Sequence, residues 1–153
     1  MILVVDDNSM TTRWVECLVR RLGFNAVAAF DGEEAIRHLA RQPFVAVISD
    51  VEMPVINGFD LLQFIRLRFP RLPVILMSAS CNAERRKTAR AYGALALLEK
   101  PVNTDHLAAL IGCGAAAHHH DPVKGMHLPQ PLERLETADQ YTAHDSSLQK
   151  SND

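Results

Sequence analysis

The stretch LVVDDNS, from Leu3 to Ser9, joins an apolar run rich in β-branched residues to two adjacent acids. Asp6 and Asp7 repel each other, and their position where a buried strand ends adds a cost of desolvation. A bound cation would offset both costs. The stretch therefore predicts a buried strand that ends at a site for a positive charge.

Four further apolar runs follow along the chain, each short and nearly continuous rather than alternating. Such runs are typical of strands that are buried on both faces of a parallel sheet. The five predicted strands span residues 2–5, 26–29, 45–49, 74–77 and 96–98.

Segments with helical spacing separate these runs. The first has apolar residues at steps of one, three and four and ends at Gly23, and we expect all of them in the core: Trp14, Val15, Leu18, Val19 and Leu22. Similar segments follow Asp31, which we expect to cap its helix, then Gly58, then Asn82, and a fifth begins near Asn103. Five alternating β-α units predict an α/β fold, with a parallel sheet and helices on both of its faces.

The composition is that of a soluble globular protein. The chain has 153 residues, 48% of them hydrophobic and 22% charged, and a net charge of −2. This charge gives no reason to expect nucleic-acid binding. The apolar runs are too short to span a membrane, and the apolar start is too short for a signal peptide. We therefore expect a cytoplasmic protein.

The texture of the sequence changes after the fifth helical segment. Residues 1–112 have the pattern of one domain, whereas residues 113–153 contain few large apolar groups and are expected to form a flexible polar tail without a core of its own. The region contains a group that could bind a transition metal, although adjacent histidines in a flexible tail are poorly preorganised for this: His118, His119, His120, Asp121 and His127.

Polar side chains follow four of the predicted strands. Because the carboxyl ends of parallel strands share one edge of the sheet, Asp6, Asp7, Asp50, Ser78 and Lys100 are expected to meet there. Clustered carboxylates suit a hard divalent cation, and magnesium is the natural choice. A lysine and a hydroxyl suit a phosphoryl group, and a carboxylate can act as its nucleophilic acceptor. The site therefore predicts magnesium-dependent phosphoryl chemistry.

Four motifs at these strand ends resemble the receiver domain of bacterial response regulators, of the chemotaxis type. They are LVVDD (3–7), VISDVEMPVINGFDLL (47–62), PVILMSA (73–79) and Lys100–Pro101. The resemblance covers residues 1–112. It implies a flavodoxin-like, doubly wound sheet of five parallel strands in the order 2-1-3-4-5.

The resemblance also assigns roles to individual residues. Asp50 would accept the phosphoryl group, and Asp6, Asp7, Asp50 and the backbone carbonyl of Glu52 would hold Mg²⁺. The side chain of Glu52 would either tune the lifetime of the phosphoryl group or be an ordinary exposed acid.

The other two site residues would act on the phosphoryl group. Ser78 would bond to a phosphoryl oxygen, and Lys100 would bridge to the phosphate through a cis bond to Pro101. The donor would be a phosphohistidine of a sensor histidine kinase or a phosphotransfer protein, and a changed surface would signal to a downstream protein. Such a domain catalyses its own phosphorylation and dephosphorylation but is a signalling protein rather than an enzyme.

Two positions depart from the usual pattern of the family. Leu97 stands where receivers often have a switching aromatic residue, and Val102 stands where Phe is common. The fourth helical segment has little apolar surface, which favours a mobile helix. Its basic residues form either a docking face or a solvated face: Arg85, Arg86, Lys87 and Arg90.

Two other functions stay open at this point. A receiver-like protein-binding module that needs no phosphorylation would agree with Leu97. A phosphatase of the haloacid dehalogenase type would also use an aspartyl phosphate, but it places a D-x-D motif at its first strand, where this chain has the adjacent pair Asp6–Asp7. Homodimerisation through the fourth and fifth helices is a further alternative.

Overall fold

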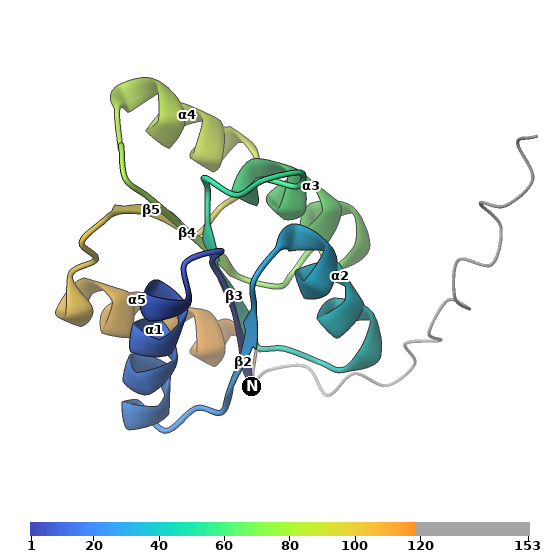
Figure 1. Ribbon diagram of the computed structural model, residues 1–153, viewed down its shortest axis with the longest axis vertical. Coiled ribbons are helices and arrows are strands. Elements are labelled where there is room, and N and C mark those ends of the chain that lie inside the picture. Colours follow the sequence, from blue (N-terminus) through green and yellow to red (C-terminus); the bar gives the residue numbers. More distant parts are fainter. Residues whose placement is uncertain (119–153) are drawn as a thin grey trace, which may run out of the picture. The chain divides into compact units, whose positions relative to one another are not determined.

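The computed structural model describes residues 1–118, and their side chains as far as residue 113. Five strands alternate with five helices along this part of the chain (Figure 1). The strands are β1 (Ile2–Val5), β2 (Ala26–Ala29), β3 (Ala46–Asp50), β4 (Val74–Ser78) and β5 (Ala96–Glu99). The helices are α1 (Ser9–Arg21), α2 (Gly32–Arg41), α3 (Gly58–Arg68), α4 (Ala83–Ala91) and α5 (Thr104–His118).

The strands form one parallel sheet in the order β2-β1-β3-β4-β5. At the centre of the sheet, Ile2 of β1 pairs with Ala26 of β2 on one side and with Ala46 of β3 on the other. The strand order reverses between β1 and β3, and a crevice for ligands forms at such a point in doubly wound sheets. The structure thus confirms the predicted α/β fold and its strand order.

Both faces of the sheet are covered, and successive residues of each strand serve opposite faces. Leu3 and Val5 of β1 pack in a core cluster with residues of α2, α3 and α4. Ile2 and Val4 pack in a second cluster with residues of α1 and α5. All four are fully buried, which explains why the strand is a continuous apolar run rather than an alternating one.

The prediction that Trp14 lies in the core is wrong. Its side chain is 44% exposed, whereas Val15 and Val19 of the same helix are fully buried. Successive residues of a helix are turned by about 100°, and the buried stripe of α1 is centred on Val15 and Val19. Thr12, a polar residue that the apolar pattern passed over, is buried on this stripe, while Trp14 and Leu22 lie at its exposed margin.

The N-terminus of α2 agrees with its predicted cap. Asp31 is the N-cap residue, and its Oδ1 accepts a hydrogen bond of 2.6 Å from the amide of Glu34. Glu34 in turn accepts one of 2.8 Å from the amide of Phe30. The first bond satisfies an amide that the first turn of a helix leaves without a partner, and the second ties the residue before the cap to the helix.

The last two helices differ in how they contact the sheet. Within α4, all of which the structure describes, Ala89 alone is buried. In α5, Leu107 and Ile111 are fully buried, and the helix continues past residue 112 to His118. The other four residues of the predicted metal-binding group, and residues 119–153 as a whole, lie outside the described residues, so the boundary between domain and tail stays a prediction. Within residues 1–118, no helix combines the length and apolar character that a membrane span requires.

Candidate functional site

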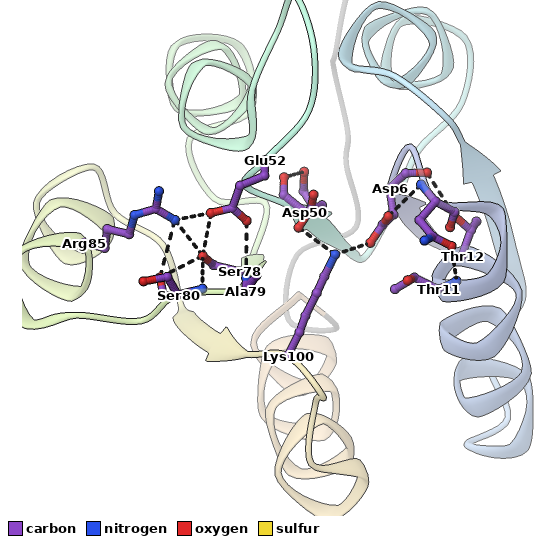
Figure 2. A network of polar contacts seen from close by, with 12 residues as sticks. Asp6, Thr11, Thr12, Asp50, Glu52, Ser78, Ala79, Ser80, Arg85 and Lys100 are labelled. Carbon is purple, nitrogen blue, oxygen red and sulfur yellow. Dashed lines mark hydrogen bonds and ion pairs between the residues drawn. The ribbon is translucent and has the colours of Figure 1, made fainter.

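Three of the predicted site residues meet at the carboxyl edge of the sheet (Figure 2). Lys100, which follows β5, lies with its Nζ 2.8 Å from Oδ2 of Asp6 and 2.8 Å from Oδ1 of Asp50. Asp6 follows β1 and Asp50 ends β3, so three strands contribute to one ion-pair cluster. The peptide bond between Lys100 and Pro101 is cis, as the resemblance implied.

The acids of β1 and β3 form a group that could hold a cation. One carboxylate oxygen each from Asp6, Asp7 and Asp50 lie within 4.8 Å of one another. Asp6 and Asp50 are buried, whereas Asp7 is exposed and leaves the group open to solvent. Carboxylate oxygens without histidine or cysteine suit a hard divalent ion that keeps some of its waters. The donor set therefore fits Mg²⁺ as predicted.

The charges of this cluster do not balance. Three carboxylates face one ammonium group, and Asp50 is only 3% exposed. Burial raises the pKa of Asp50, and the charges of Asp6 and Glu52 add to this, against the opposing effect of Lys100. Burial alone would lower the pKa of Lys100, but its contacts with Asp50 and Asp6 outweigh burial and raise it. A bound divalent cation would relieve the excess negative charge.

Local backbone contacts hold the acids in place. The amide of Asn8 donates a 2.9 Å hydrogen bond to Oδ1 of Asp6, and the hydroxyl of Thr12 donates one of 3.0 Å to the Asp6 carbonyl. These two bonds tie the start of α1 to the end of β1. On the other side of the site, Gly58 begins α3 directly against β3, where a Cβ atom would lie 2.2 Å from the carbonyl oxygen of Asp50.

Ser78 lies at the edge of the sheet as predicted, but in contacts that the sequence did not indicate. Its Oγ lies 2.8 Å from Oε1 of Glu52 and 2.8 Å from a guanidinium nitrogen of Arg85. Arg85 also forms an ion pair with Glu52. Among the described residues, the hydroxyl of Ser78 forms hydrogen bonds with Glu52, Ser80 and Arg85 and not with Asp50. We call Glu52, Ser78, Ser80 and Arg85 the Ser78 network (Figure 2).

The Ser78 network changes the interpretation of two residues. Glu52 is exposed, as one alternative had it, but it is not isolated. Partial burial would raise its pKa, but hydrogen bonds from Ser78, Arg85 and the amide of Ala79 outweigh this and lower the pKa. Arg85, one of the basic residues of α4, turns back toward the site. No spacing in the sequence marked this pair, since Glu52 and Arg85 are separated by 33 residues.

The two positions that depart from the family pattern are both buried. Leu97 is 7% exposed and belongs to the core cluster of α2, α3 and α4, and Val102 packs in the cluster of α1 and α5. The backbone carbonyl of Leu97 accepts a 3.4 Å hydrogen bond from Arg86 of α4. The position that often carries an aromatic ring thus has an apolar side chain without a polar group.

Comparisons with known proteins identify the family of this chain. The family model described as "Response regulator receiver domain" matches residues 2–112. The transcriptional regulatory protein ZraR of Escherichia coli is 35% identical over 119 residues, which are 78% of this chain and 27% of ZraR. The response regulator protein FleR of Pseudomonas aeruginosa is 39% identical over 111 residues, 72% of this chain and 23% of FleR. The chain therefore spans about a quarter of the length of these relatives.

Solved structures agree as well. A response regulator receiver protein from Pseudomonas putida, 30% identical, has a TM-score of 0.69 over 73% of this chain and 94% of its own. A response regulator receiver domain protein from Clostridium thermocellum, 27% identical, has a TM-score of 0.71 over 75% of this chain and 93% of its own. Neither of the two other functions left open by the sequence is favoured by these matches. The chain belongs to the response regulator receiver domain family of two-component signalling proteins.

Proposed function

We propose that Asp50 accepts a phosphoryl group from a phosphohistidine of a sensor histidine kinase or phosphotransfer protein. The observation that carries this proposal is the position of Asp50, which is a buried carboxylate 2.8 Å from Lys100 and within 4.8 Å of two further acids. A buried carboxylate next to a fixed ammonium group and a cation site has what phosphoryl transfer requires, namely position and charge neutralisation.

The side chains divide the work of this transfer. A carboxylate oxygen of Asp50 forms the new bond to phosphorus as the bond from phosphorus to the donor nitrogen breaks, and the donor ring, protonated on its other nitrogen, leaves as neutral imidazole. Lys100 offsets the charge that gathers on the phosphoryl oxygens, and the hydroxyl of Ser78 donates a hydrogen bond to one of them. Asp6, Asp7, Asp50 and the carbonyl of Glu52 would hold Mg²⁺, which supplies further neutralisation of this charge.

The phosphorylated chain then acts on another protein. Hydrolysis of the acyl phosphate at Asp50 by the chain itself would return it to the resting state. We propose that a changed surface carries the signal to a downstream protein partner. As an alternative, the changed surface would mediate homodimerisation through α4 and α5.

Intact-mass measurement after incubation with acetyl phosphate tests the proposal. The wild-type chain is expected to gain one phosphoryl group with Mg²⁺ and none with EDTA, and Asp50→Asn is expected to gain none under either condition. Asp60→Asn, an exposed acid on α3, is the matched control and is expected to gain the group like wild type. A gain by Asp50→Asn would exclude Asp50 as the acceptor, and no gain by the wild type would favour a module that works without phosphorylation.

The same substitution should stabilise the fold. The raised pKa of Asp50 means that its ionisation lowers stability as pH rises through the folded-state pKa, so removing the charge is expected to add about 1 kcal/mol at neutral pH without Mg²⁺. Urea denaturation of wild type and Asp50→Asn in EDTA measures the difference, which should shrink at pH values below the pKa of an unfolded aspartate. A less stable Asn variant would show that the carboxylate charge is already fully compensated by Lys100.

A further inference from the structure

The hydroxyl of Ser78 has no hydrogen-bonding capacity left for a phosphoryl group. A hydroxyl has one proton to donate and two lone pairs with which to accept. Ser78 Oγ accepts from Arg85 at 2.8 Å and from the amide of Ser80 at 3.1 Å. Its proton can go to Glu52 or to the carbonyl of Ser80, both 2.8 Å away. To donate to a phosphoryl oxygen on Asp50, this hydroxyl must give up a bond that it now makes.

Arg85 connects this hydroxyl to α4. It lies in the first turn of the helix, where its amide donates a 2.8 Å hydrogen bond to the N-cap residue Asn82. Its guanidinium group reaches both Glu52 and Ser78. Because Ala89 is the one buried residue of α4, apolar packing holds the helix weakly. Its polar contacts include those of Arg85 in the Ser78 network and the bond from Arg86 to the Leu97 carbonyl.

We propose that Arg85 is a positioning residue that couples the state of Asp50 to the position of α4. The proposal rests on the proposed function, since it requires a phosphoryl group on Asp50. That group carries a charge of about −1.5 to −2. The phosphoryl group accepts a hydrogen bond from the hydroxyl of Ser78. It also repels the carboxylate of Glu52, whose charge already acts on Asp50. As Ser78 and Glu52 leave their resting positions, Arg85 loses both partners and the first turn of α4 is released.

Arg85 would take the role of the switching aromatic residue that other receivers often have on β5. Leu97 is buried in the core and has no polar group with which to follow the hydroxyl of Ser78. Arg85 reaches the same hydroxyl from the other side, through a charge-assisted hydrogen bond. The signal would therefore leave the site through α4.

Hydrogen exchange of α4 in the full chain tests the coupling, with beryllofluoride and Mg²⁺ as the probe of the phosphorylated state. In the wild type, the probe is expected to make the amides of residues 85–87, which are the first in α4 that donate hydrogen bonds, exchange several-fold faster. In Arg85→Ala these amides should exchange fast without the probe and show no further change with it. Lys87→Ala, an exposed cation on the same helix, is the matched control and should respond like wild type.

Titration of the probe provides a second readout that a purely structural role of Arg85 would not change. In Glu52→Ala/Arg85→Ala the net charge is preserved and Ser78 no longer bonds to Glu52, so beryllofluoride is expected to bind about tenfold more tightly than to wild type. Arg85→Ala alone should bind beryllofluoride no more tightly than wild type. Glu52 then still accepts the hydrogen bond of Ser78, and its negative charge faces the site without the positive charge of Arg85.

The outcomes separate the two proposals. A wild-type chain that gains a phosphoryl group at Asp50, together with an Arg85→Ala variant whose α4 responds to the probe like wild type, overturns the role of Arg85 alone. If Glu52→Ala/Arg85→Ala binds beryllofluoride with the affinity of the wild type, the role of Arg85 is likewise overturned. A wild-type chain that neither gains a phosphoryl group nor binds beryllofluoride overturns both the coupling and the proposed function.

Discussion

Replacing Gly58 with alanine is expected to lower the free energy of unfolding by about 3 kcal/mol, near the upper end for overpacking. The new Cβ would lie 2.2 Å from the carbonyl oxygen of Asp50 and 2.8 Å from the Cα of Val51. Both are backbone atoms of the segment that leaves β3, so no flexible side chain can turn aside. Either the start of α3 must move away from β3, or the backbone at Asp50 must shift. Phosphorylation by acetyl phosphate should therefore fall together with stability.

Urea denaturation of Gly58→Ala beside Gly112→Ala measures this effect. Gly112 lies in α5, and no atom lies within 4 Å of a Cβ built there. Alanine at that position should therefore raise stability by about 0.5–1 kcal/mol, as expected for a glycine replaced within a helix. Equal effects of the two substitutions would show that the contact between α3 and β3 is loose enough to accept a methyl group.

Replacing Lys100 with methionine is expected to cost about 2 kcal/mol of stability without Mg²⁺, less than for a fully buried ion pair because the lysine side chain is 24% exposed. The substitution leaves the buried carboxylates of Asp6 and Asp50 without their ammonium partner. The pKa of Lys100 is raised by these contacts, so its contribution in the wild type is complete below the unfolded-state pKa of lysine and is lost as pH rises through the folded-state pKa.

A second substitution in the same cluster gives the control for this prediction. Lys100→Met combined with Asp50→Asn removes one charge of each sign and should recover most of the stability that Lys100→Met loses. Urea denaturation of the wild type, both single variants and the double variant closes the cycle. If the change in stability of the double variant equals the sum of the changes in the two single variants, the ion pair between Lys100 and Asp50 contributes nothing.

The sequence predicted the fold and the acidic site because both depend on local patterns. Each buried strand is a continuous apolar run, and each polar side chain of the site follows directly after such a run. The parallel sheet then brings Asp6, Asp50 and Lys100 together irrespective of their separation along the chain. The sequence thus predicts that these residues meet at one edge of the sheet, and the structure adds the distances between them.

The remaining features depend on side chains that no pattern marks. Trp14 fits an apolar helical repeat as well as Val15 does, yet the rotation of α1 on the sheet leaves it exposed and buries Thr12 instead. Arg85 is one of several basic residues in α4, and only the placement of the first helical turn decides which of them reaches Glu52. Interactions of this kind depend on how helices sit on the sheet, which short-range periodicity does not specify.

The ion pair between Lys100 and Asp6 joins residues that are 94 positions apart, and this separation bears on the chain during its synthesis. A nascent chain that has released only the first four strands from the ribosome has its acids but not the lysine that partly compensates them. Such an intermediate carries the charge repulsion of the site without its counter-ion from β5. The negative charge of the site is therefore partly compensated only late in translation, once the residue that follows the fifth strand can fold against Asp6.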